Sequence, residues 1–498
     1  MIVVVTFALN SAFNFAVGLL VAKFLGPAEF GRFALALAVA TFINSAAFDW
    51  IRLAATRFYA ERTRRERPQV RATLDAAFAM ISAVVGVVAL TVILAGIKLQ
   101  LSPALASLSV AAAVANALYD YHTALVRARF LDRTYGRLIL TKNVLALALT
   151  VGGAWWFGSA KFALIGWCLS VAGALASASA ALTDPGASPR RASGALMRDY
   201  ARYGVPIITA LVLYQLIPLA NRMLTTSLYG FSETGQFSLA FDIGVRLVAA
   251  IGSTLDVLLF QIAVQFDETH GSDRARQQVA HNMTVVFAVV LPTCVGCWMV
   301  LPSFEALVVP AEFRGPFAHY LGLLLPGLCA FALIQYAINP LFQIVKRTMP
   351  LIAAALVACA VDAGLILVLP RGNDASSLAI AQAAALIAGS TALLAIAAAS
   401  RPVWPKLRDV LVTLVSTATM AGLLLPFRSM TPGLGTLSIE IAVGVGVVVA
   451  FVMIFDLAGL RQMALSRLRG GAARRRTPRP PEVAADSLSV PRARPPRS

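Results

Sequence analysis

Long apolar runs, broken at intervals by charged and turn residues, make up most of this chain. Each run is close to or above the roughly 20 apolar residues that a helix needs to cross a bilayer. The pattern predicts about fourteen membrane-spanning helices. The predicted spans are residues 3–24, 33–54, 74–96, 104–126, 138–158, 162–182, 204–228, 236–259, 282–302, 318–343, 350–370, 377–399, 409–427 and 437–459.

The composition agrees with an integral membrane protein. Of the 498 residues, 59% are apolar and 13% are charged, whereas soluble domains carry roughly 25% charged residues. A soluble globular protein, a disulfide scaffold and a disordered chain are therefore excluded. The five cysteines lie inside apolar runs without a nearby histidine cluster, so no metal site or redox site is predicted. The expected fold class is all-α and integral to the membrane.

Basic residues are distributed unequally between the two sides of the predicted membrane. The net charge is +18, and 31 of the 42 Lys and Arg residues fall on the side that holds both termini. Eight lie on the other side and three lie within spans. This asymmetry follows the positive-inside rule, so both termini are expected in the cytoplasm. Anionic membrane lipids, and not nucleic acid, are the expected partners of these charges.

A duplicated motif is the most informative feature of the sequence. Residues 26–36 and 230–240 both fit G-x-x-E-x-G-x-F-x-L-A, with six identities in eleven positions and an offset of 204 residues. The first Gly suits the left-handed conformation that ends a helix. The Glu falls in the first turn of the next helix, where the helix dipole favours an anion, and the second Gly allows close helix contact. The motif positions are Gly26, Glu29, Gly31, Gly230, Glu233 and Gly235.

The position of the motif predicts the arrangement of the two halves. Six predicted spans separate the copies, so both hairpins lie on the outer face and the repeat is parallel. We expect two six-helix lobes on either side of a central cavity, followed by a C-terminal helix pair. The expected divisions are an N-lobe at 1–182, a linker at 183–203, a C-lobe at 204–400, the helix pair at 401–460 and a disordered basic cytoplasmic tail at 461–498.

Charged side chains within the spans are the candidate functional residues, because charges at membrane depth are costly and usually face a cavity or a partner. Arginine binds phosphate in a bidentate manner, so a series of cations predicts an anionic substrate. Asp49 and Asp242 are candidate counter-charges or sites for a coupling ion. The structural alternatives are an intrahelical pair between Asp242 and Arg246, four residues apart, and cations that extend to the headgroups. The candidate substrate-binding residues are Lys23, Arg52, Lys142, Arg222 and Arg246.

The run at residues 23–36, K-F-L-G-P-A-E-F-G-R-F-A-L-A, resembles the first hairpin of the polysaccharide-biosynthesis flippases, which belong to the multidrug/oligosaccharidyl-lipid/polysaccharide (MOP) exporter superfamily. The second hairpin, with Asn221-Arg222, is similar to that family's second lobe, where Asp commonly precedes the Arg. The resemblance implies a V-shaped fold of two lobes around a cationic cavity. It also implies transfer of an undecaprenyl-pyrophosphate-linked oligosaccharide, an O-antigen or exopolysaccharide repeat unit, from the cytoplasmic to the periplasmic leaflet. Glycan polymerases and glycosyltransferases are the protein partners that it implies, and Na⁺ or H⁺ the coupling ions, without a cofactor.

Other functions remain open at this stage. The alternatives are a drug/cation antiporter of the same superfamily, another solute transporter, and an integral-membrane glycan polymerase or ligase. An enzyme of that kind needs catalytic carboxylates or histidines in an outer loop. The longest predicted outer loop, residues 303–317, offers Glu305 and Glu312 as its only acids. The sequence therefore predicts a transporter and not an enzyme.

Overall fold

The computed structural model describes residues 2–96, 100–184, 186–270, 272–344, 348–399 and 403–462, and every regular element within these ranges is a helix. Eleven helical segments in the same ranges are long and apolar enough to cross a membrane. An all-helical integral membrane protein is thus confirmed. The number fourteen stays a prediction, because two of the eleven segments are 50 and 57 residues long.

Both over-long segments contain the predicted hairpin. Helix α1 (Ile2–Ile43) is interrupted at Gly26, with φ 68° and ψ 174°, and helix α10 (Gly194–His270) is interrupted at Gly230, with φ 85° and ψ 179°. These angles are not those of a left-handed helical turn. They belong to a region that essentially only glycine occupies, so each motif begins at a backbone position that excludes other residues.

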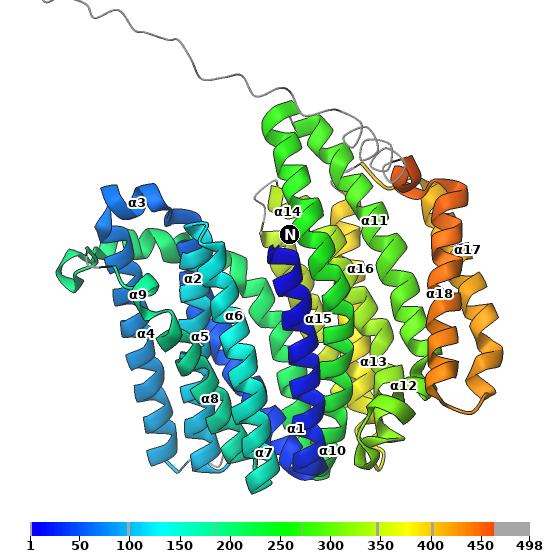
Figure 1. Ribbon diagram of the computed structural model, residues 1–498, viewed down its shortest axis with the longest axis horizontal. Coiled ribbons are helices and arrows are strands. Elements are labelled where there is room, and N and C mark those ends of the chain that lie inside the picture. Colours follow the sequence, from blue (N-terminus) through cyan, green and yellow to red (C-terminus); the bar gives the residue numbers. More distant parts are fainter. Residues whose placement is uncertain are drawn as a thin grey trace, which may run out of the picture.

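The first lobe lies on one side of α1, as Figure 1 shows. The chain passes from α1 through a π-helical turn, Asn44–Phe48, into the helices that build this lobe. These are α2 (Asp49–Phe58), α3 (Glu61–Glu66), α4 (Pro68–Leu94), α5 (Pro103–Ala128), α6 (Asp132–Leu145), α7 (Val151–Phe157), α8 (Ala160–Ser177) and α9 (Ser179–Leu182).

The second lobe lies on the other side of α1 and α10, and a final helix pair lies at its far edge (Figure 1). Helix α10 begins inside the predicted linker, because Tyr200 stacks on Phe58 with ring centroids 4.9 Å apart and so anchors this segment to α2. The predicted tail lies outside the described residues from 463 onward. The remaining helices are α11 (Ser272–Met299), α12 (Leu301–Val308), α13 (Pro316–Leu333), α14 (Asn339–Ile344), α15 (Met349–Val368), α16 (Ser376–Ala399), α17 (Leu407–Leu424) and α18 (Leu434–Phe455).

The two hairpins cross each other at the second glycine of each motif. A Cβ on Gly31 would overlap the carbonyl oxygen of Phe231 and lie 2.9 Å from the backbone nitrogen of Gly235. A Cβ on Gly235 would overlap the carbonyl oxygen of Pro27 and lie 3.1 Å from the nitrogen of Gly31. Each copy of the motif therefore supplies the glycine that lets the backbone of the other copy approach, as expected for two parallel repeats in contact.

The motif glutamates join each hairpin to the helix of the sixth predicted span of its own lobe, α8 in the first lobe and α16 in the second. Glu29 accepts a hydrogen bond of 2.8 Å from the N–H of Ala160, the first residue of α8. Glu233 accepts one from the Tyr320 hydroxyl and a longer one, 3.5 Å, from the N–H of Ala375, just before α16. A carboxylate at a helix N-terminus stabilises both unpaired N–H groups and the helix dipole. The second lobe repeats the contact of the first.

Replacing Glu29 by glutamine is expected to lower the stability of the N-lobe, since a hydrogen bond to a charged group contributes about 1.5–3 kcal/mol. The melting temperature of purified protein in detergent measures the loss. Asp132, in the first turn of α6, is the control carboxylate, because it is exposed and makes no side-chain hydrogen bond or ion pair among the described residues. Equal melting temperatures for E29Q and D132N would contradict the capping role.

Candidate functional site

Arg222, on the first arm of α10, lies at the contact between the lobes. Its side chain is buried and pairs with Asp242 on the second arm of the same hairpin. It also donates a 3.4 Å hydrogen bond to the carbonyl oxygen of Ala34, on α1, and its guanidinium lies 5.3 Å from the centre of the Phe241 ring. A charge with 5% exposure needs such partners, because an unpaired buried ion is very costly.

Arg246, one turn beyond Asp242 on the second arm of α10, contacts the first arm of α1. Its Nη1 donates to the carbonyl oxygen of Asn14, and its guanidinium fills the space beside Gly18. The structural alternative, an intrahelical ion pair between Arg246 and Asp242, is not seen in the described part of the chain, where Asp242 pairs with Arg222. Both C-lobe arginines therefore donate to N-lobe backbone carbonyls, and they bridge the two lobes through groups that an anion could replace.

A second group of polar side chains lies inside the N-lobe. The π-helical turn at 44–48 carries Asn44, which donates 3.1 Å to Asp120 on α5. Asp49 follows the turn, is buried, and accepts a 2.8 Å hydrogen bond from Arg52. The Arg52 side chain is 43% exposed. π-helical turns are frequent at functional sites, and this one lies where α1 continues into α2, beside these polar groups.

Lys142 and Lys23 have different surroundings. Lys142, on α6, lies 4.8 Å from the centre of the Tyr119 ring and 5.1 Å from that of Trp167, so aromatic faces enclose its ammonium group inside the N-lobe. Lys23 is exposed near the hairpin, 5.9 Å from the centre of the Phe24 ring. The structure therefore places three of the five candidate cations, Arg222, Arg246 and Lys142, in protein surroundings.

A buried carboxylate in the C-lobe was given no specific role by the sequence pattern. Asp362, on α15, is 4% exposed and accepts hydrogen bonds of 3.0 and 3.1 Å from the side-chain amide of Asn221. Asn221 directly precedes Arg222, so α10 presents an amide to one helix and a cation to the other lobe. The signal that could have identified this contact was the isolated Asp in an otherwise apolar span.

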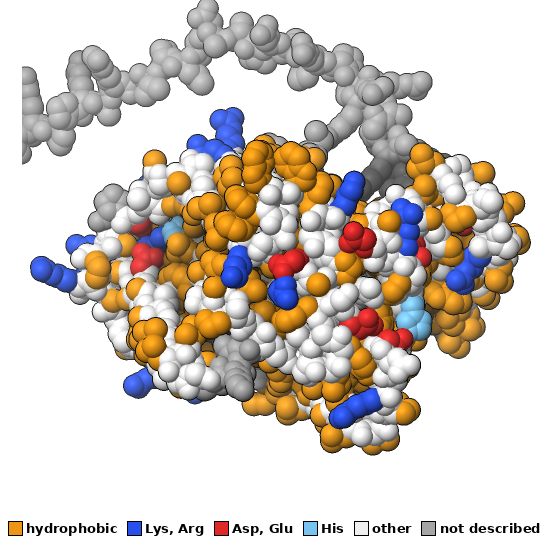
Figure 2. Space-filling model, turned by 90° about the horizontal axis from the view of Figure 1, so that it is seen from below, with side chains coloured by type: hydrophobic (Ala, Val, Ile, Leu, Met, Phe, Trp, Pro, Cys, Tyr) orange, Lys and Arg blue, Asp and Glu red, His pale blue; other side chains and the backbone are white. Residues whose placement is uncertain are grey.

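The end of the N-lobe that lies away from the motif hairpins is held together by ion pairs. Arg129 donates 2.8 Å to Glu61 and lowers the pKa of that carboxyl, while Arg64 lies 3.3 Å from Asp184. Burial, and then the hydrogen bond to Asp184, raise the pKa of Tyr59 to about 12, so this hydroxyl stays protonated. These pairs join three connecting segments. The opposite end, viewed in Figure 2, carries basic and acidic side chains scattered over a largely apolar and neutral face.

Known proteins resemble this chain in fold. No family model and no curated protein matches the sequence. The lipid II flippase MurJ, in an inward closed conformation, superposes with a TM-score of 0.67 at 14% identity, over 91% of this chain and 98% of that chain. An outward-facing multidrug resistance MATE family transporter of the MOP superfamily superposes with a TM-score of 0.51 at 11% identity, over 85% of this chain and 95% of that chain. The chain thus shares its fold with this lipid flippase and with this multidrug transporter.

Proposed function

We propose that this chain, which has the fold of a lipid flippase and of multidrug transporters, is a flippase for an anionic lipid-linked oligosaccharide. The substrate would be an undecaprenyl-pyrophosphate-linked O-antigen or exopolysaccharide repeat unit that moves from the cytoplasmic to the periplasmic leaflet. The observation that carries the proposal is the pair of C-lobe arginines, Arg222 and Arg246, that donate to carbonyl oxygens of the N-lobe. Arg246 can exchange its carbonyl acceptor for phosphate oxygens, which are stronger acceptors. Arg222 also pairs with Asp242, so phosphate would compete with that carboxylate.

The proposed transport cycle follows from the contacts that each arginine loses and gains. When the lobes separate on the cytoplasmic side, Arg246 loses the carbonyl of Asn14 and becomes available to a pyrophosphate. Arg52, which is partly exposed, would make the first contact. Closure around the bound headgroup followed by separation on the outer side releases the lipid there. Arg222 would bind the headgroup on this outward part of the path, because it lies closer to the hairpin.

Asp49 and Asp242 would return the arginines to their substrate-free state. Asp242 already pairs with Arg222, and Asp49 with Arg52, so each carboxylate competes with the substrate for its arginine. Entry of Na⁺ or H⁺ at either carboxylate would free the arginine, and loss of the ion would displace the phosphate. Without such competition the ionic attraction would retain the product. We place the protein in the bacterial inner membrane with cytoplasmic termini, in contact with the glycosyltransferases or polymerase that make and use the glycan.

The double variant R52A/R246A tests this function in cells. Loss of most glycan export is expected, because each removed bidentate contact contributes about 1.5–3 kcal/mol to phosphate binding. Surface glycan is measured on immunoblots at matched protein abundance. The control is R62A/R371A, at two exposed arginines outside the lobe contact. Export at the wild-type level by R52A/R246A would refute the role of these arginines.

The second candidate is a drug/cation antiporter, which the MATE-like fold favours. A cation carrier would use Asp49, Asp242 and Asp362 as ligands and would not need Arg246. The two functions therefore differ in which substitutions abolish them. An antiporter would lose drug efflux in D49N and D242N and keep it in R246A, and wild-type cells would show resistance to cationic dyes.

A further inference from the structure

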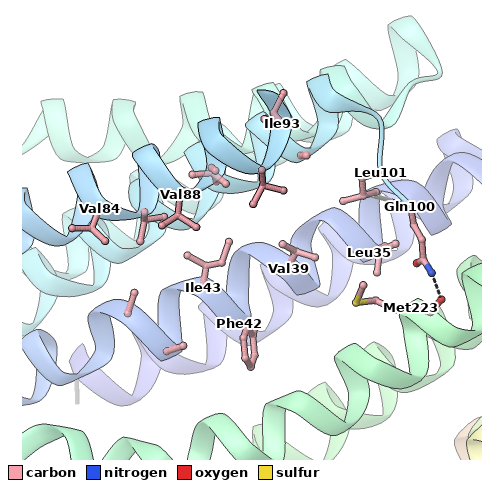
Figure 3. Close-up of a pocket in the computed structure, with 17 residues that line it drawn as sticks. Leu35, Val39, Phe42, Ile43, Val84, Val88, Ile93, Gln100, Leu101 and Met223 are labelled. Carbon is pink, nitrogen blue, oxygen red and sulfur yellow. Dashed lines mark hydrogen bonds between the residues drawn. The ribbon is translucent and has the colours of Figure 1, made fainter. Parts of the chain in front are cut away.

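An apolar cleft runs along the outer half of the N-lobe, between the second arm of α1, α4 and α5. Its volume is about 440 Å³, and Figure 3 shows aliphatic side chains facing it from both walls. Val84, Val88 and Ile93 line one wall, and Val39 and Ile43 line the other. Gln100 lies at one end and donates a 2.8 Å hydrogen bond to the carbonyl oxygen of Met223, on α10.

The cleft forms because α4 packs against the lobe only in its first part, up to Phe78. The buried residues of this helix end at Phe78, and beyond it the side chains of Val84 and Val88 are 55% and 56% exposed. The wall therefore continues directly into a surface that contacts lipid tails in the bilayer. Small residues in the walls, Ala46 and Ala89 among them, leave the space open.

The dimensions match one hydrocarbon chain in one leaflet. The nine-residue rise from Val84 to Ile93 is about 14 Å at 1.5 Å per residue, which is about half of the roughly 30 Å hydrocarbon core. The polar end at Gln100 lies toward the outer face, where headgroups reside. Two walls of branched side chains hold a single chain, as in a prenyl lipid, whereas a phospholipid would have to leave its second chain outside.

The cleft also reaches the contact between the lobes. Met223 and Leu35, which line it, directly follow Arg222 and Ala34, and these two residues share the interlobe hydrogen bond of 3.4 Å. A chain seated in the cleft therefore lies next to the arginine that we assign to the outward part of the path. We infer a chain of the transported lipid as the occupant because the cleft is continuous with the interlobe contact, in addition to being apolar.

We propose that the cleft holds the polyprenyl tail of the transported lipid in the outer leaflet while the headgroup leaves the lobe contact. This inference rests on the proposed flippase function. The tail stays in hydrocarbon surroundings throughout, so that only the headgroup crosses the membrane. Apolar burial along the cleft then orients the lipid before release.

The test uses full-length protein in vesicles and a polyprenyl phosphate with a photoreactive diazirine near the end of its tail. V88W fills the cleft from α4. V87W is the matched control, because Val87 is 63% exposed on the same helix and does not line the cleft. Crosslinked peptides covering residues 35–47 and 84–93 are expected to be labelled in wild type and V87W, and about tenfold less in V88W.

The occupant is distinguished by competition. Excess diacyl phosphatidylglycerol is expected to leave the labelling unchanged, and excess unlabelled polyprenyl phosphate is expected to abolish it. Displacement by phosphatidylglycerol to the same extent, or equal labelling of V88W and wild type, would overturn the proposal. Labelling is measured without transport, so failure of the flippase function alone would leave the labelling pattern intact and abolish only lipid movement.

Discussion

Replacing Gly31 by alanine is expected to destabilise the protein strongly and to abolish transport. The new Cβ would overlap the carbonyl oxygen of Phe231, and this oxygen belongs to the backbone, so no side-chain rotation relieves the contact. Overpacking of a closed contact costs about 1–3 kcal/mol. Here the cost falls on the crossing of the two hairpins, on which the relative position of the lobes depends. Melting temperature in detergent and glycan export report the two effects.

Two further variants complete this experiment: G235A, at the equivalent glycine of the second motif, and G86A, at a glycine without close neighbours. G235A is expected to lower the melting temperature as much as G31A, because its Cβ would overlap the carbonyl oxygen of Pro27. G86A, on α4, is the control, since nothing lies within 4 Å of a Cβ there. Alanine is favoured over glycine in a helix by about 0.5–1 kcal/mol, so G86A should be unchanged or slightly stabilised. A G31A protein as stable and active as G86A would show that the hairpins do not cross closely.

Replacing Asp242 by alanine is expected to give the second large effect. It leaves Arg222 buried without its carboxylate partner, and breaking a buried pair in this way costs about 3–5 kcal/mol. The variant should melt far below wild type and accumulate poorly. Removing both charges, in R222M/D242L, is expected to restore most of the stability, because well-packed apolar side chains often replace a buried ion pair without loss.

The double variant separates stability from function. R222M/D242L is expected to fold at near wild-type abundance. If Arg222 binds the headgroup, this folded variant does not export glycan. Export at the wild-type level by this stable variant would make the pair purely structural. An R222M/D242L protein that melts as low as D242A would instead show that the space between the lobes requires the charges themselves.

The repeat could be predicted from the sequence because backbone conformation and close backbone contact require glycine at its key positions. Positive φ at Gly26 and Gly230 excludes other residues, and the close crossing excludes a Cβ at Gly31 and Gly235. Such constraints leave the same letters at the same spacing in both halves. Apolar length predicted the helices for the same reason, since the bilayer fixes what a span requires.

The hydrogen-bond and ion-pair partners of the polar side chains could not be predicted from the sequence. Spacing offered an intrahelical pair between Asp242 and Arg246 as one alternative, whereas Asp242 pairs with Arg222 across the hairpin. The choice depends on how the two arms face each other, which a linear pattern does not contain. The contact of Asn221 with Asp362 joins residues 141 positions apart, and the apolar cleft arises from the way α4 leaves the lobe. These features depend on tertiary packing alone.

Movement of a lipid headgroup by the purified protein tests the central claim most directly. Vesicles would carry the protein and a fluorescent polyprenyl-pyrophosphate-linked sugar, and a membrane-impermeant quencher would report the outer leaflet. Protein with intact Arg52, Arg222 and Arg246 should exchange the whole labelled pool between leaflets, and R52A/R246A should leave half of it protected, as in protein-free vesicles. Equally slow exchange in vesicles with wild-type protein, with R52A/R246A and without protein would contradict a cationic path for phosphate. Dye transport by the wild-type protein in addition would identify a cation carrier.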